Sequence, residues 1–243
     1  MKTSSSNRWH RMVTVPLSVL SIGVGLLFSG VASAQMTGSA HDFSAQNWNG
    51  YTEICVVCHT PHNAYTEGEA GAGPGELGPL WNRALTNVDN FSTYLDQARV
   101  GSDIQGTGFA NNLTGVSKLC LSCHDGTIAI DSFGRDGAGL PNVGTTFVGT
   151  INANANIGEG DAIAQTGNLS NDHPVAFTFP TTDIEIVTIS GNTVNGQTTD
   201  MPLFGAGQME CATCHDVHAT GTFGPLLRVD NTNSGLCLNC HIK

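Results

Sequence analysis

One five-residue pattern occurs four times in this chain and restricts what it can fold into. Each copy reads C-x-x-C-H, at residues 55–59, 120–124, 211–215 and 237–241, and the copies contain all eight cysteines. These cysteines are Cys55, Cys58, Cys120, Cys123, Cys211, Cys214, Cys237 and Cys240. A disulfide framework does not require such tight pairs, and a zinc site does not require a histidine after every pair.

The repeated pattern is the attachment signature of c-type haem. Two thiols bond covalently to the porphyrin vinyl groups, and the histidine that follows becomes the proximal ligand of the iron. A lone C-x-x-C also occurs in zinc sites and redox disulfides, but four copies of the full C-x-x-C-H pattern are specific for haem c. The sequence therefore predicts four covalently bound haems c.

Residues 1–34 have the features of a secretion signal peptide, which we expect to be cleaved. They comprise a positively charged start, an apolar stretch at 13–28 and a small-residue cleavage site at 32–34. An uncleaved membrane anchor is the alternative, because residues 12–34 are just long enough to span a bilayer. Export agrees with the haem prediction, since covalent haem attachment takes place outside the cytoplasmic membrane in bacteria.

The remaining chain is strongly acidic. Residues 35–243 carry 6 Lys and Arg against 20 Asp and Glu, a formal net charge of −14, and haem propionates would add to it. This balance argues against nucleic acid and anionic membranes as partners. It suits cationic partners and mineral metals.

The expected fold is loop-rich, with short α-helices at the C-x-x-C-H motifs and a minor β-hairpin. Stretches such as 68–78 and 152–160 carry almost no large apolar side chain, so the protein core is small. Covalently attached haems would fill that core, which predicts a multihaem cytochrome c fold organised round a stack of four haems. Residues 87–99 could form an amphipathic helix, and residues 183–194 read as a small hairpin.

The order of motifs indicates a degenerate repeat. A lone histidine, then C-x-x-C-H-x-x-H, then a plain C-x-x-C-H occurs twice along the chain. We therefore expect one tetrahaem domain at 35–243, composed of two dihaem units at about 35–140 and 165–243. Chance placement of a few histidines is the alternative.

The histidine count predicts two imidazole ligands for every iron. The proximal histidines are His59, His124, His215 and His241. Four spare histidines remain outside residues 1–34, namely His41, His62, His173 and His218. Four spare histidines for four irons favour distal ligation by each of them, and we leave open which histidine pairs with which haem.

Two of the spare histidines cannot serve the nearest haem. His62 follows His59 by three residues and His218 follows His215 by three, so each pair leaves the backbone on the same side of a porphyrin. We therefore expect His62 and His218 each to ligate a different haem, which brings haems close together. Two axial imidazoles leave no vacancy for a substrate, so the sequence predicts an electron-transfer protein and not an enzyme.

Several segments carry a family resemblance: "EICVVCHTPHNA" at 53–64, "PLWNR" at 79–83, "LCLSCHDGT" at 119–127, "DHPV" at 172–175 and "CATCHDVH" at 211–218. They resemble the multihaem c-type cytochromes with doubled C-x-x-C-H motifs. Within that group, the length and four-haem layout are most similar to the OmcE-type extracellular tetrahaem cytochromes, which polymerise into conductive nanowires.

The resemblance implies a head-to-tail homopolymer at the cell surface or outside the cell, in which His62 ligates a haem of the next subunit. Other redox proteins or extracellular acceptors would then be its partners. A first-haem end docked on a last-haem end is a heterologous contact, which repeats into an open fibre. The alternatives are a soluble periplasmic tetrahaem shuttle with His62 ligating in its own chain, and a membrane-anchored quinol dehydrogenase.

Overall fold

A computed structural model describes most of the region that carries the C-x-x-C-H motifs. The described residues are 36–46, 48–67, 77–86, 88, 90–93, 113, 115–134, 163, 167–218, 223–224 and 226–242. The chain divides into two units, Met1–Ser33 and Ala34–Lys243, and every described residue belongs to the second. The predicted signal peptide therefore lies outside the described residues. In the described part of the chain, no helix has the length and apolar character needed to cross a membrane.

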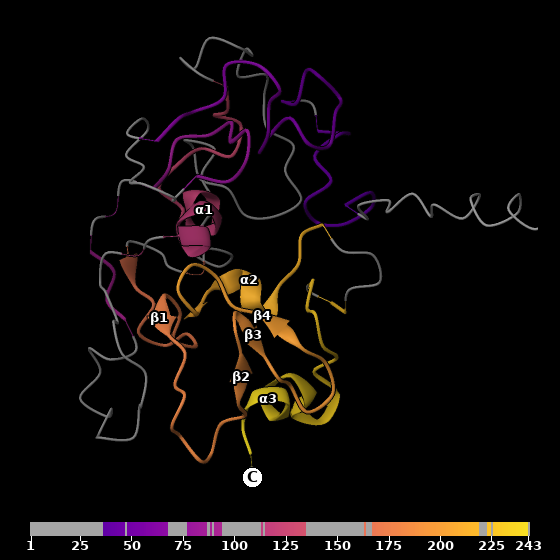
Figure 1. Ribbon diagram of the computed structural model, residues 1–243. Coiled ribbons are helices and arrows are strands. Elements are labelled where there is room, and N and C mark those ends of the chain that lie inside the picture. The colour runs from indigo at the N-terminus through magenta and orange to yellow at the C-terminus, as the bar shows by residue number, and fades with distance from the viewer. Residues whose placement is uncertain are drawn as a thin grey trace, which may run out of the picture. The chain divides into compact units, whose positions relative to one another are not determined.

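Three short α-helices carry three of the four C-x-x-C-H copies (Figure 1). α1 (Gly115–His124) contains the second copy, α2 (Cys211–Cys214) begins at the third, and α3 (Gly235–Cys240) contains both cysteines of the fourth. A 3-10 turn, η4 (Thr232–Ser234), leads into α3. These are positions at which the sequence predicts short helices.

The first copy forms a single turn in place of the expected helix. The backbone N–H groups of Cys58 and His59 both donate to the carbonyl oxygen of Cys55, at 3.1 and 2.7 Å. The turn does not continue, because His59 pairs with Trp81 in an antiparallel bridge. Pro61 also disfavours helical backbone at the residue before it.

The strands are short and antiparallel. β1 (Phe177–Thr178) pairs with β5 (Gln208–Met209). β2 (Ile189–Ser190), β3 (Thr193–Val194) and β4 (Met201–Pro202) form a second sheet with β3 in the centre. The loop between β2 and β3 begins at Gly191, whose φ of +58° is a conformation that glycine adopts without strain. A hairpin thus lies within 183–194, where the sequence predicts one.

The helix predicted for residues 87–99 is wrong over its described part. Residues 88 and 90–93 are not helical, and Ser92 instead forms a parallel bridge with Asn168. Ser92 donates to Gly167 and accepts from Leu169, both at 2.7 Å. This pairing with a distant segment overrides the local helical pattern, and residues 94–99 lie outside the described residues.

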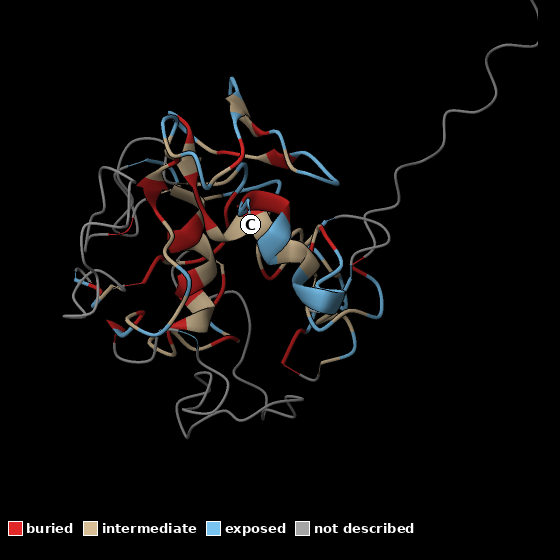
Figure 2. Ribbon diagram, turned by 90° about the horizontal axis from the view of Figure 1, so that it is seen from below, coloured by how far each residue is buried: buried red, intermediate tan, exposed pale blue. Residues whose placement is uncertain are grey.

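Buried residues, red in Figure 2, are spread over several segments of the ribbon. Apolar side chains gather in small separate clusters, and three of these border C-x-x-C-H cysteines. The N-terminal cluster consists of Trp48, Val57, Ile130 and Phe133. The C-terminal cluster consists of Phe177, Phe179, Val187, Val194, Met201, Leu203, Met209, Val229 and Cys240. Cys58 and Cys123 pack against the first cluster, and Cys214 packs against the second, which includes Cys240 itself. The first two motifs thus share one cluster and the last two share another.

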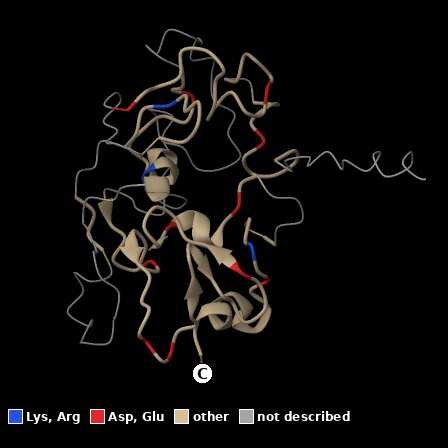
Figure 3. Ribbon diagram, viewed as in Figure 1, with Lys and Arg blue, Asp and Glu red and all other residues tan. Residues whose placement is uncertain are grey.

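Basic side chains are scarce among the described residues, as Figure 3 shows. They are Arg83, Lys118 and Arg228; the first two are buried and the third forms an ion pair. The described surface is therefore acidic, in line with the charge of the whole sequence.

Candidate functional site

The first C-x-x-C-H turn is held by the segment 79–82. Asn82 donates its backbone N–H to the carbonyl of Cys58 at 2.9 Å and its side-chain amide to the carbonyl of Val56 at 2.6 Å. The His59 ring meets the Trp81 ring edge to face, with ring centroids 5.8 Å apart at 84°. These contacts fix the turn without a helix.

The main-chain carbonyl of Pro79 determines which ring nitrogen of His59 carries a proton. Nδ1 of His59 lies 2.7 Å from the carbonyl oxygen of Pro79. A carbonyl can only accept, so Nδ1 carries the proton and Nε2 is left to bind a metal. Metal-bound histidines ordinarily donate their second N–H to such a partner, which orients the ring and raises its basicity.

The second motif occupies α1, and its histidine is half-buried. Burial, with smaller contributions from the imidazoles of His41 and His215, lowers the pKa of His124 from 6.5 to about 4. Burial, followed by the effect of His215, likewise lowers the pKa of His41. Both imidazoles are therefore neutral at physiological pH, which is the form that binds metal. Nδ1 of each ring is buried and has no hydrogen-bond partner among the described residues.

Two pairs of histidines face each other at nearly the same separation. The ring centroids of His41 and His124 are 5.9 Å apart, and those of His59 and His218 are 6.0 Å apart. A metal–imidazole bond is about 2 Å long and the ring centre lies about 1 Å behind the nitrogen, so two ligands on opposite sides of one metal place their ring centres about 6 Å apart. Each pair thus combines one C-x-x-C-H histidine and one spare histidine at the centroid spacing that two imidazole ligands of one metal would have.

The third motif is joined to the second through Glu210, the residue before α2. The Glu210 carboxylate accepts from the backbone N–H and the hydroxyl of Ser117 in α1. The Ser117 hydroxyl oxygen in turn accepts the backbone N–H of Cys211 at 3.0 Å. Burial raises the pKa of Glu210, although the hydrogen bonds from Ser117 act in the opposite direction. The helices of the second and third motifs are therefore linked by a buried polar contact.

The fourth motif is anchored by Asn239, which lies between its two cysteines. The side-chain oxygen of Asn239 accepts from the backbone N–H groups of Thr198 and Thr199 at 2.9 and 3.2 Å. Its amide nitrogen donates to the carbonyl of Thr199 at 2.8 Å. Gly196 lies so close to Asn239 and Thr199 that a Cβ there would overlap both. The loop 196–199 thus fixes α3.

Three of the C-x-x-C-H thiols are shielded to an extent that opposes redox reactivity. Burial raises the pKa of Cys58, Cys214 and Cys240 to about 11 in each case. Reactive C-x-x-C thiols need a lowered pKa, which these three thiols do not have, whereas the hydrogen bond with Cys120 lowers the pKa of Cys211. Cys120 and Cys211 lie in side-chain hydrogen-bond contact, which brings the second and third motifs together at their first cysteines.

The other predicted ligands lie at the surface. His62, His173, His215 and His241 are all exposed. Nδ1 of His173 lies 2.9 Å from the carbonyl of Pro174, which leaves Nε2 as the metal-binding nitrogen. Among the described residues, neither His62 nor His173 makes a ring contact with another histidine.

Sequence reasoning missed three residues around these ligands: Pro79, Asp216 and Arg228. The acceptor on Pro79 is a main-chain carbonyl, which leaves no side-chain signature. Asp216 and Arg228 form an ion pair of 2.6 Å beside the third motif, and their separation of 12 residues does not point to pairing. Pro79 and Asp216 lie within segments that carry the family resemblance, but no sequence pattern assigns a role to either of them or to Arg228.

The arrangement fits haem iron, which takes only two ligands from the protein. Within the described residues, no group of three or more His, Cys, Asp and Glu side chains is placed to hold a metal ion. A structural zinc site needs four such ligands, whereas haem iron takes only two from the protein. The two facing histidine pairs, each with one histidine from a C-x-x-C-H motif, fit that requirement.

Comparison with known families supports the same cofactor. Residues 204–243, which include the third and fourth motifs, match a family described as "Doubled CXXCH motif". No curated protein matches the chain. Doubled C-x-x-C-H motifs indicate covalently bound haem c and are consistent with the multihaem c-type cytochromes, which transfer electrons.

Proposed function

We propose that this protein is an exported tetrahaem c-type cytochrome, which transfers electrons through closely spaced bis-histidine haems. The observation that carries the proposal is the pairing of two C-x-x-C-H histidines with spare histidines at centroid separations of 5.9 and 6.0 Å. When bound, haem iron supplies a one-electron Fe(III)/Fe(II) couple. Two histidines of the protein would hold each iron and leave no open position for a substrate, so the site favours electron transfer over catalysis.

The two facing pairs give a ligand assignment. His41 is the distal partner of His124, and His218 is the distal partner of His59. His62 and His173 are left for the haems of His215 and His241. We assign His62 to the His241 haem of a neighbouring subunit and His173 to His215, on the resemblance to the OmcE-type filaments, because all four histidines are exposed and exposure does not distinguish them.

Two dihaem units then compose one domain at 35–243, folded round a stack of four haems. The shared N-terminal cluster behind the first two motifs and the shared C-terminal cluster behind the last two support this division. The pairing of His59 with His218 crosses between the units, as does the contact of Glu210 with Ser117. Such crossings bring haems of the two units close together, which electron hopping requires.

We further propose that the subunits join head to tail in an extracellular filament like that of the OmcE-type cytochromes. His62 beside the first motif and His241 in the fourth are both exposed, which a contact between unlike surfaces of two copies requires. The signal peptide expected at 1–34 would deliver the chain out of the cytoplasm. The acidic surface disfavours nucleic acid and anionic lipid and leaves redox proteins or extracellular acceptors as partners.

Haem content and spin state test the proposal. Purified protein should contain four haems per chain by the pyridine haemochrome assay, and haem should remain on the chain in a denaturing gel. The oxidised filament should have a purely low-spin spectrum, because every iron has two imidazoles. Haem that dissociates on denaturation, or a high-spin haem that persists in filaments, contradicts the proposal. Electron microscopy separates a filament from a monomeric shuttle.

A further inference from the structure

The segment that follows α2 is held against a second strand-like segment. His215 forms an antiparallel bridge with Leu227. Asp216 donates its backbone N–H to the carbonyl of Leu226 at 2.8 Å, and Arg228 donates its own to the carbonyl of Cys214 at 2.9 Å. The backbone of residues 214–216 is thereby fixed, but these bonds stop two residues short of His218.

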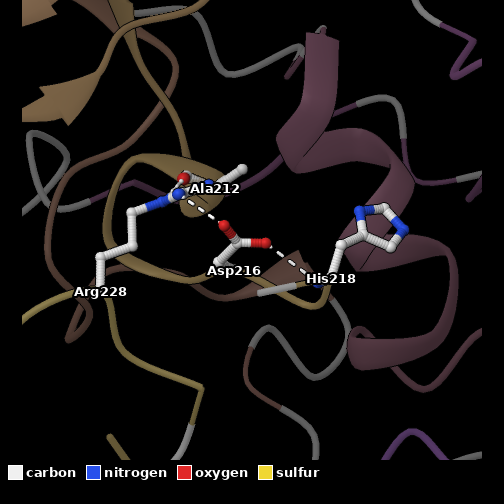
Figure 4. Close-up of polar contacts among 4 residues, drawn as sticks. All are labelled: Ala212, Asp216, His218 and Arg228. Carbon is white, nitrogen blue, oxygen red and sulfur yellow. Dashed lines mark hydrogen bonds and ion pairs between the residues drawn. The ribbon is translucent and has the colours of Figure 1, made fainter. Parts of the chain in front are cut away.

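The side chain of Arg228 connects α2 to Asp216. Its Nε donates to the carbonyl of Ala212 in α2 at 2.9 Å, and one terminal nitrogen bonds Oδ2 of Asp216 at 2.6 Å (Figure 4). Charged hydrogen bonds of this kind are stronger than neutral ones and more specific in geometry. Both side chains are about four-fifths shielded, at 24 and 19 % relative exposure, so solvent screens the ion pair less than a fully exposed one.

The second oxygen of Asp216 reaches the distal histidine itself. Oδ1 of Asp216 accepts the backbone N–H of His218 at 2.9 Å, which makes an Asx turn (Figure 4). One carboxylate therefore joins Arg228 to the backbone of His218. The ring of that exposed histidine lies 6.0 Å from the ring of His59, centroid to centroid, with 38° between the planes.

We infer that Arg228 and Asp216 are positioning residues that hold His218 as the distal ligand of the haem attached at Cys55 and Cys58. An exposed side chain on a short loop must give up conformational freedom to ligate an iron. The Arg228–Asp216 pair removes part of that freedom in advance, so ligation costs less. This inference rests on the proposed function and adds how one of its ligands is held.

Carbon monoxide binding to the reduced protein measures how firmly a distal histidine holds its iron. In Asp216→Ala and Arg228→Gln, one haem of the four should bind carbon monoxide about tenfold more readily, the scale on which outer partners of metal ligands act. Asp216→Asn keeps the acceptor for His218 and loses the charge, so its effect should be smaller. Asp230→Ala is the matched control, because Asp230 makes the same kind of turn with Thr232 and is not connected to a histidine.

A double-variant experiment ties the effect to His218. With His218→Ala already present, Asp216→Ala should add nothing, because the ligand it positions is gone. The inference is overturned if Asp216→Ala behaves like Asp230→Ala, if it affects all haems alike, or if it acts equally in the His218→Ala background. A wild-type protein without covalent haem would instead contradict the proposed function, and that result is visible before any variant is made.

Discussion

Glu210 and Ser117 lie 93 residues apart in the chain, yet the carboxylate of the first accepts both the backbone N–H and the hydroxyl of the second. This contact joins the start of α1 to the residue before α2. The other carboxylate oxygen, Oε1, is buried and has no hydrogen-bond partner in the described part of the chain. A half-satisfied buried carboxylate is costly when ionised.

The stability of the protein should therefore depend on the ionisation of Glu210. Burial raises its pKa above the ordinary value of 4.5, so the folded chain holds this proton more tightly than the unfolded chain. As pH rises above 4.5, the unfolded chain ionises first, and the free energy of unfolding falls until the pH passes the raised pKa. Glu210→Gln should remove this fall.

Denaturant unfolding of wild type and Glu210→Gln from pH 4 upward measures the effect, and the slope with pH is the quantity to compare. Glu185→Gln is a suitable control, because Glu185 is exposed. If the free energy of unfolding changes with pH in the same way for wild type and Glu210→Gln, burial does not raise the pKa of this carboxylate.

Gly196→Ala should destabilise the region round the fourth motif. A Cβ at this position would overlap the carbonyl oxygen of Thr199 and the side-chain amide of Asn239, neither of which can move without losing hydrogen bonds. We expect a loss of about 2 kcal/mol, typical of overpacking. Gly224→Ala is the control, because a Cβ there meets no atom within 4 Å. Equal thermal midpoints for the two variants would contradict the close packing of loop 196–199 on α3.

The assignment of His41 to the haem of His124 can be tested by removing that haem. His41→Ala alone should turn one haem of the four high-spin, because it removes one axial ligand. In a protein with Cys120→Ala and Cys123→Ala, which lacks the second haem, His41→Ala should leave the other haems low-spin. His173→Ala in that same background should still produce one high-spin haem. If His41→Ala also produces one there, it ligates another iron.

His62→Ala should separate assembly from folding. If His62 ligates the terminal haem of a neighbouring subunit, the joint contains a coordinate bond, and removing it should yield folded four-haem monomers without long filaments. Free imidazole should restore the low-spin spectrum without restoring the fibre. Electron microscopy and absorption spectra provide the two readouts. Filaments of His62→Ala with every iron six-coordinate would assign His62 to a haem of its own chain.

The sequence predicts the local features of this fold better than its long-range contacts. The spacing of residues along the chain defines each C-x-x-C-H motif, and the two-residue Gly191-Asn192 loop defines the hairpin. The motifs and the hairpin could therefore be predicted from the sequence alone. The helix expected at 87–99 is wrong in its described part, because pairing of Ser92 with Asn168 is not visible in a local pattern. The helix expected at the first motif is absent for a similar reason, namely the bridge to Trp81.

In the candidate site, too, the sequence predicts local relationships better than long-range contacts. The three-residue spacing from His215 to His218 excludes a shared iron, and the structure brings His218 to His59. The sequence could not choose His59 over other haems, because that choice depends on how distant loops fold together. The sequence does not predict the pairing of Asp216 with Arg228, because charged pairs are common on protein surfaces and have no sequence motif.

The hydrogen bond from His59 to Pro79 has a consequence for how this protein tolerates mutation. Its acceptor is a main-chain carbonyl, which every amino acid possesses, so a change of side chain at position 79 does not remove it. Substitutions at position 79 should therefore leave the hydrogen bond to His59 intact unless they change the course of the backbone. Insertions or deletions between residues 60 and 78 are the heritable changes that could displace the carbonyl from the ring.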